Sequence, residues 1–119
     1  MEIIFHAHHA VISERMRRRA ELAVQRAAAR LTRAVDAIVR FEQDGPVKRV
    51  EIVLHAPRQR SIVALAEDRF YGRALSSAIS KLSAQARKLG RARKSAERRR
   101  AGIRARAARA ARETQVVRA

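Results

Sequence analysis

The chain has 119 residues, a length typical of one domain, and 28 Lys or Arg against 11 Asp or Glu give it a formal net charge of +17. Alanine supplies 25 of its 56 hydrophobic residues, so the remaining apolar side chains suffice for one small core but not for a deep substrate pocket. The absence of cysteine excludes disulfides and cysteine-ligated zinc. Such an excess of base predicts a polyanionic partner.

The first two elements predicted along the chain are a short strand and a long helix. Residues 2–8 are rich in β-prone side chains and predict the strand. Ser13 is a typical helix N-cap residue, and residues 14–35 follow without Gly or Pro, with their apolar side chains on one helical face. We therefore expect an amphipathic helix of about six turns over residues 14–35.

Three strands and a second helix are predicted in the rest of the chain. Alternating apolar and polar residues indicate strands at 37–43, 47–55 and 60–67, with turn residues between them. From about Phe70 the apolar residues follow helical spacing. The order β-α-β-β-β-α predicts an α+β fold in which two helices cover one face of a four-stranded sheet. The other face would meet solvent or a partner.

Charge divides the chain into two parts. Residues 1–84 carry 15 basic and 9 acidic residues, whereas residues 85–119 carry 13 basic and 2 acidic residues. The C-terminal stretch consists mostly of Ala and Arg, with too few large apolar side chains for a core of its own. We therefore expect an α+β domain over residues 1–94 and a basic tail, helical or disordered, over residues 95–119.

Basic residues form a stripe on the outer face of each predicted helix, where acidic residues are almost absent. Like charges four residues apart destabilise a helix, so these stripes indicate a surface that meets phosphates. The residues predicted to bind RNA are Arg19, Arg26, Arg30, Arg33, Arg73, Lys81, Arg87, Lys88, Arg91 and Lys94. Phe41 is the one aromatic candidate near the strands for base stacking, so we expect recognition of structured RNA by shape, with DNA as an alternative.

The histidines and acidic residues give little support to metal binding or catalysis. His6 and His8 would share a strand face and could meet His55 from another strand, but no carboxylate or Cys stands at a matching spacing. We expect no metal, no cofactor and no small-molecule substrate. No Gly-rich phosphate loop or Ser–His–Asp spacing indicates an enzyme. Glu67 and Asp68 precede the second helix, where we expect them to complement its N-terminal dipole.

The stretch from residue 64 to residue 94 carries a pattern of its own. A strand ends in the acidic Glu67, and the helix that follows contains the sequence Lys81-Leu82-x-x-Gln85. Its basic continuation consists of Lys88, Arg91 and Lys94. This pattern resembles the fourth strand and second helix of the ribosome hibernation-promoting factor and ribosome-associated inhibitor family. The opening strand, polar cap and helix are also similar to that family's start, so the resemblance covers roughly residues 1–94.

The chain departs from that family at the head of the second helix. Phe70 and Gly72 stand where the family has an aspartate and a tyrosine, and Tyr71 lies one place out of register. Ser76 and Ser80 stand in the places of later aspartates. These departures remove negative charge, which suits the binding of RNA.

The resemblance implies a cytoplasmic protein that binds rRNA of the small ribosomal subunit where mRNA and tRNA normally lie. Such a protein blocks translation in starved or stationary cells and preserves idle ribosomes. Long members carry a C-terminal dimerisation domain, for which this chain has no room, so we expect the short type, a monomer off the ribosome, with no membrane partner. The alternative is a general RNA- or DNA-binding protein that recognises nucleic acid by shape. A third reading places the cationic tail on a membrane or an acidic partner, with shallow insertion.

Overall fold

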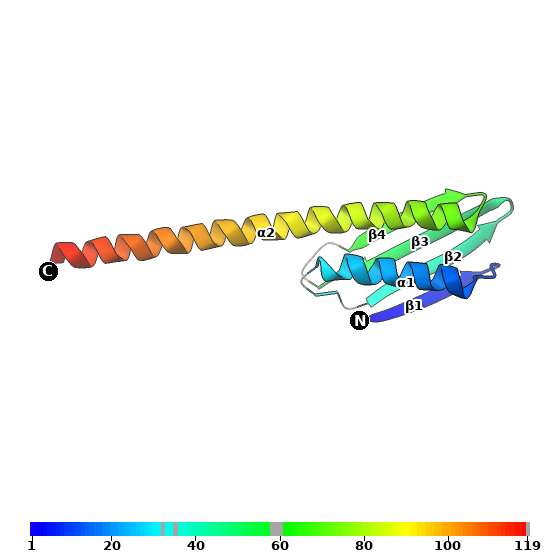
Figure 1. The fold of residues 1–119 in the computed structure, drawn as a ribbon, viewed down its shortest axis with the longest axis horizontal. Helices are drawn as coiled ribbons and strands as arrows, with labels where there is room; N and C mark the ends of the chain where they lie inside the picture. The colour runs from blue at the N-terminus through cyan, green and yellow to red at the C-terminus, as the bar shows by residue number, and fades with distance from the viewer. Residues whose placement is uncertain (32, 35, 58–60, 119) are drawn as a thin grey trace. The chain divides into compact units, whose positions relative to one another are not determined.

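The strands and helices form in the predicted order, β-α-β-β-β-α (Figure 1). The computed structural model describes residues 1–31, 33–34, 36–57 and 61–118, with the side chains of all of these except Arg93 and residues 112–118. The elements are β1 (Glu2–His8), α1 (Glu14–Ala29), β2 (Asp36–Asp44), β3 (Val47–His55), β4 (Ile62–Asp68) and α2 (Tyr71–Arg118). Thr32 and Val35 of the predicted first helix, and Arg60 of the predicted last strand, lie outside the described residues.

The four strands make one sheet in the order β1-β2-β3-β4. β1 lies parallel to β2, with Ile4 opposite Ile38, whereas β2, β3 and β4 form an antiparallel meander. A parallel neighbour cannot be reached by a tight turn, so α1 serves as the crossover between β1 and β2. The expected four-stranded α+β fold is confirmed, and the structure adds that β1 occupies an edge beside β2.

A two-residue loop of Gly45 and Pro46 joins β2 to β3, since Asp44 is the residue that pairs with Val47. Gly45 has φ +58°, the left-handed region that glycine enters without a Cβ clash. A positive φ at the first loop position followed by the fixed negative φ of proline is typical of a type II′ hairpin turn. The turn residues predicted from the sequence therefore set the register of β2 and β3.

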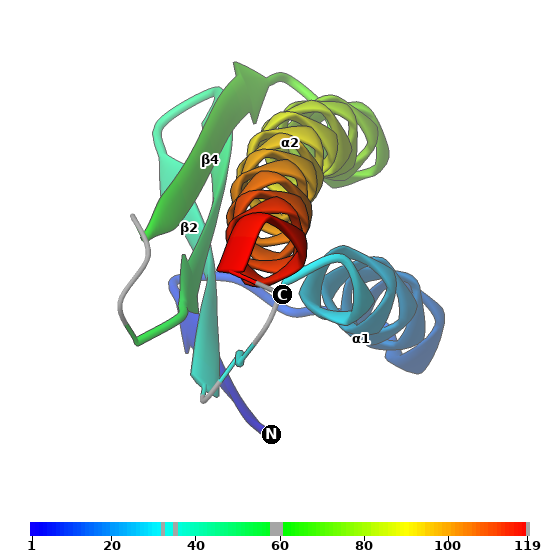
Figure 2. The ribbon, with the colours of Figure 1, turned by 90° about the vertical axis from the view of Figure 1, so that its left-hand side faces the viewer.

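One face of the sheet packs against the helices, and Figure 2 shows α1 and α2 side by side on it. Three alternating residues of each of β2, β3 and β4 are buried there, including Phe41, Ile52 and Ile62. Leu75 and Leu82 of α2 complete this core from the helical side. Many of the other core positions are alanines, because small side chains let two helices approach the sheet closely.

The predicted length of the first helix was wrong. α1 ends at Ala29, well before residue 35, and Arg33 lies beyond it. The amides of Arg30 and Leu31 bond to carbonyls three residues back, which tightens and closes the last turn. The physical reason is tertiary: Leu31 is buried in the core, and the chain must turn there to reach β2.

The chain forms two compact units, Met1–Leu89 and Gly90–Ala119. The first holds the sheet, α1 and the part of α2 up to Leu89, which we call α2N. The second continues α2 as helical backbone to Arg118. Side chains described in the second unit are mostly exposed, as expected for a stretch of Ala and Arg. No described helix combines the length and hydropathy that crossing a membrane requires.

Candidate nucleic-acid interface

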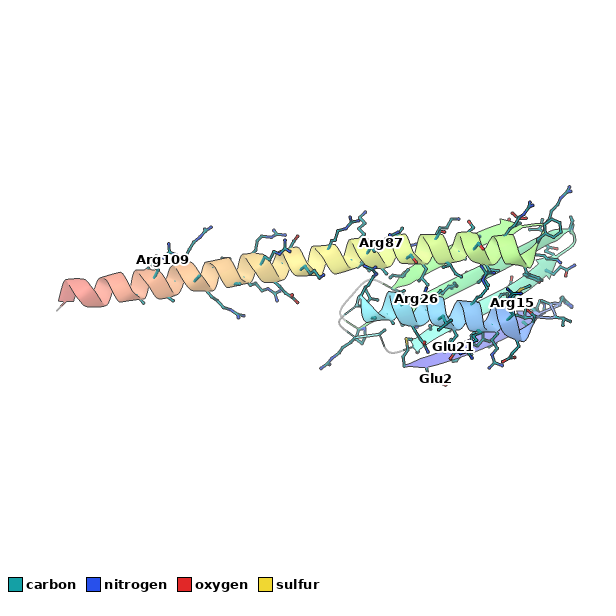
Figure 3. The ribbon with its side chains drawn as sticks, viewed as in Figure 1. Glu2, Arg15, Glu21, Arg26, Arg87 and Arg109 are labelled. Carbon is teal, nitrogen blue, oxygen red and sulfur yellow. The ribbon has the colours of Figure 1, made fainter. Side chains whose placement is uncertain are left out.

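Charge is segregated between the two layers of the first unit. α1 and α2N together carry nine basic residues and two acidic ones, Glu14 and Glu21. Figure 3 labels Arg15 near the start of α1, Arg26 near its end and Arg87 on α2. Within the described residues, no salt bridge joins a cation of these helical segments to a carboxylate. The outer face of the helices is therefore strongly positive.

The arginines of the sheet, by contrast, are neutralised by neighbours. Arg49 on β3 places its Nε 2.8 Å from Glu67 on β4 and its Nη1 3.4 Å from Glu42 on β2. The hydrogen bond to Glu67 raises the pKa of the Arg49 guanidinium, so it stays charged. Arg40 pairs with Glu51 at 3.5 Å. These cations are occupied by carboxylates, which leaves the helical face as the candidate anion-binding surface.

Arg19 links the two helices of this surface. Its Nη2 donates a hydrogen bond of 2.8 Å to the Oγ of Ser76 on α2, and that hydroxyl donates to the Gly72 carbonyl. Arg19 and Arg26 stand at the sides of a groove of about 230 Å³ between α1 and α2, lined also by Leu22, Ala23, Ile79 and Ser83. The structure thus brings two predicted RNA contacts from α1 together beside α2. The sequence pattern did not single out Leu22, and it noted Ser76 only as a replacement for an aspartate, not as a partner of Arg19.

Lys81 has a contact within the protein that its place in a basic stripe did not predict. Its Nζ donates a hydrogen bond of 2.7 Å to the carbonyl of Leu65 on β4. One turn further along α2, Gln85 Nε2 donates to the carbonyl of Val63 at 2.9 Å. Both carbonyls belong to the strand at the edge of the sheet. An ammonium has three donors, so Lys81 retains two for another acceptor.

The other predicted contacts are exposed but are not all in one place. Arg30 is the C-terminal cap of α1, and Arg33 follows it. On α2, the guanidinium of Arg73 lies over the Phe70 ring, 5.3 Å from its centroid. Arg87 and Lys88 are exposed at the C-terminal end of α2N, whereas Arg91 and Lys94 belong to the second unit.

The aromatic side chains offer little for base stacking. Phe41, the predicted candidate, is buried in the core and faces Tyr71 edge-to-face, with ring centroids 6.0 Å apart. Phe70 is the exposed one, and it is already covered on one side by Arg73. This distribution favours contacts to phosphates over the reading of bases.

One histidine and three acidic residues form contacts within the protein. His55 Nδ1 lies 2.6 Å from Asp36 Oδ1 across β2 and β3. The part of the chain that the structure describes contains no cluster of three potential metal ligands. Asp68 accepts a hydrogen bond from the amide of Phe70, which precedes α2, and the first turn of α2 itself contains no acidic residue. The expectation for Glu67 was wrong, because its carboxylate is engaged by Arg49 on the sheet.

Comparison with known proteins gives a consistent family and fold. The family described as sigma 54 modulation protein / S30EA ribosomal protein matches residues 3–94. A ribosomal subunit interface protein from Coxiella burnetii superposes with a TM-score of 0.62 at 20% identity, covering 75% of this chain and 97% of that one. The N-terminal domain of Protein Y from Thermus thermophilus gives 0.62 at 21% identity, covering 75% and 99%. Comparison with curated proteins gave no significant sequence match.

Proposed function

The chain belongs to the sigma 54 modulation protein / S30EA ribosomal protein family, and from this premise we propose that it is a ribosome-associated factor that inhibits translation by binding the small ribosomal subunit. In this proposal it occupies the path of mRNA and tRNA in starved or stationary cells. Inhibition then needs only occupancy, and no chemical step. The protein reaches the ribosome as a monomer and acts in the cytoplasm.

The observation that carries the proposal is the separation of charge between the helices and the sheet. α1 and α2N carry nine basic residues and only two acidic ones. The sheet arginines Arg40 and Arg49, by contrast, form salt bridges with carboxylates. Cations that form no salt bridge among the described residues suit the phosphates that line a channel built of rRNA. It gives affinity through the backbone and shape of the RNA, with no need for base-specific contacts.

We propose ten side chains as phosphate contacts. They are Arg19, Arg26, Arg30, Arg33, Arg73, Lys81, Arg87, Lys88, Arg91 and Lys94. Arg19 donates one hydrogen bond to the Ser76 hydroxyl, and Lys81 donates one to the Leu65 carbonyl. These hydrogen bonds hold the two side chains close to the protein surface. In the proposal residues 1–94 form the ribosome-binding domain, and the basic tail over residues 95–119 adds further contacts to RNA.

Co-sedimentation with purified ribosomal subunits over a series of salt concentrations tests the proposal. We expect one copy per small subunit, displaced by mRNA with tRNA, and a slope of log affinity against log salt between about −4 and −5 if about six phosphates are neutralised. The variant R26Q/K88Q removes two cations from the helices. Its matched control, R40Q/R49Q, removes two from the sheet, so both variants carry the same net charge.

The two variants separate specific from general binding. We expect R26Q/K88Q to bind subunits more weakly and to inhibit an in vitro translation reaction less, and R40Q/R49Q to behave like the parent. Equal losses in both would indicate that only net charge matters. Binding in many copies that duplex RNA competes away would favour the alternative, a general binder of structured nucleic acid.

A further inference from the structure

The face of the sheet that the helices leave open carries an ordered pattern of side chains. The register places Ile4, Ile38, Val53 and Val63 in one row across all four strands. The next row along the strands is His6, Arg40, Glu51 and Leu65, and the one after it is His8, Glu42, Arg49 and Glu67. On the other side of the apolar row stand Glu2, Asp36 and His55. An apolar row is therefore flanked by charged rows on both sides.

The apolar row is accessible to a partner. Val63 is 50% exposed and Leu65 beside it 41%, and at the opposite edge Ile4 is 38% exposed. Ile38 and Val53 between them are half-buried. No described element covers this face, so the contiguous strip of aliphatic side chains is a candidate interaction surface rather than a scatter of single exposed residues.

The charges of this face have the opposite sign to those of the helices. Its rows hold five carboxylates, Glu2, Asp36, Glu42, Glu51 and Glu67, against the two guanidinium groups of Arg40 and Arg49, which pair with Glu51, Glu42 and Glu67. Two cations against five carboxylates leave a formal charge of −3 on these rows with His counted as neutral. The helical cations lie beyond a helix layer about 10 Å thick. The charged groups that a ligand on the sheet would touch are therefore those of the sheet itself.

We propose that the open sheet face is a second binding surface, which takes a Lys- or Arg-rich protein segment whose aliphatic side chains lie on the Ile4–Val63 row. Charge complementarity selects this occupant, because the same carboxylates repel RNA and anionic lipid. The proposal does not depend on what the helices bind. It gives the protein two faces of opposite preference, one for a polyanion and one for a basic protein.

Amide chemical shifts of the isotope-labelled full-length protein test this with two synthetic hexapeptides, one of alternating Lys and Val and one of alternating Glu and Val. We expect the basic peptide to shift amides of β1 to β4, centred on Ile38 and Val53. We expect the acidic peptide to shift amides of α1 and α2 instead. Shifts from the basic peptide that are absent, or that follow the helices, would overturn the proposal.

Two variants, one in the sheet and one in α1, attribute binding to the carboxylates. E42Q/E51Q/E67Q keeps hydrogen-bond acceptors opposite Arg40 and Arg49 while removing three charges from the sheet, and we expect about tenfold weaker binding of the basic peptide. E14Q/E21Q removes charge from α1 and should leave binding unchanged. If sheet amides instead shift with protein concentration when no peptide is present, the occupant is the basic segment of a second copy, and the assignment to a separate partner is wrong.

Discussion

Lys81 on α2 donates a hydrogen bond of 2.7 Å to the main-chain carbonyl of Leu65 on β4. Gln85, four residues later on the same helical face, repeats the contact with the carbonyl of Val63 at 2.9 Å. β4 forms one edge of the sheet, and unpaired carbonyls at an edge can recruit a strand from another molecule. Two donors on one helix therefore cover that edge. They belong to the Lys-Leu-x-x-Gln sequence, in which Leu82 fills the core.

Replacing Lys81 by methionine keeps the aliphatic stem and removes the donor. We expect K81M to lower the free energy of unfolding by about 0.5–1 kcal/mol, the net value of one exposed hydrogen bond, and to increase self-association at high concentration. K88M is the control, because Lys88 is exposed on the same helix and its substitution removes the same charge. Urea denaturation measures the free energy of unfolding of both variants. Equal stability of the two variants would contradict the role of Lys81 at the strand edge.

Tyr71 at the start of α2 is buried, and its hydroxyl has no hydrogen-bond partner among the described residues. A buried polar group without a partner costs about 1–3 kcal/mol. We therefore expect Y71F to raise the free energy of unfolding by about 1 kcal/mol at neutral pH, measured by urea denaturation. A loss of stability would mean that the Tyr71 hydroxyl forms a hydrogen bond in solution.

The same tyrosine gives the protein an alkaline dependence. Burial raises the pKa of Tyr71, and the nearby Glu42 carboxylate raises it further. Above about pH 10 the unfolded chain therefore releases a proton that the folded chain keeps, so the free energy of unfolding falls as pH rises. We expect this fall to be smaller in Y71F. The chain has one Tyr and no Trp, so tyrosinate absorbance reports the titration of Tyr71 alone; a midpoint at the ordinary value would contradict the burial.

Gly45 tests the hairpin turn. A Cβ at this position would meet nothing within 4 Å, so G45A changes only the backbone, whose φ of +58° disfavours alanine. We expect a loss of about 1–2 kcal/mol in the free energy of unfolding. Gly72 on α2 also has open space at its Cβ but no positive φ, so G72A should be neutral or stabilise by up to about 1 kcal/mol. Similar effects of both substitutions on the urea midpoint would mean that the backbone of the turn adjusts to a φ that alanine tolerates.

Arg19 and Ser76 connect the two helices and can be examined as a pair. Their hydrogen bond of 2.8 Å lies at the surface, so we expect a coupling free energy of about 0.5 kcal/mol from the double-mutant cycle of R19A and S76A. Urea denaturation of the four proteins measures it. A coupling of zero would show that Arg19 does not hold α1 against α2, and that its guanidinium is as mobile as that of any surface arginine.

Much of the architecture follows from local patterns in the chain. The alternation of Val50, Ile52 and Leu54 predicted both a strand and its buried face, and the helical spacing of Leu75 and Leu82 did the same for α2. The signal is local because side chains alternate every two residues in a strand and return every 3.6 in a helix. The Asp44-Gly45-Pro46 turn and the Ser13 cap were predictable for the same reason.

Other features depend on how distant segments meet, and only the tertiary structure decided them. α1 stops at Ala29 because Leu31 enters the core, a contact that no helical pattern contains. The carboxylates of the sheet come from four strands, and only their register gathers them around one apolar row. The sequence pattern placed Lys81 in a basic stripe, and only the packing of α2 against β4 shows that it donates a hydrogen bond to the Leu65 carbonyl. Local spacing determined which residues share a face, whereas contacts between elements determined which charged and apolar groups each face presents.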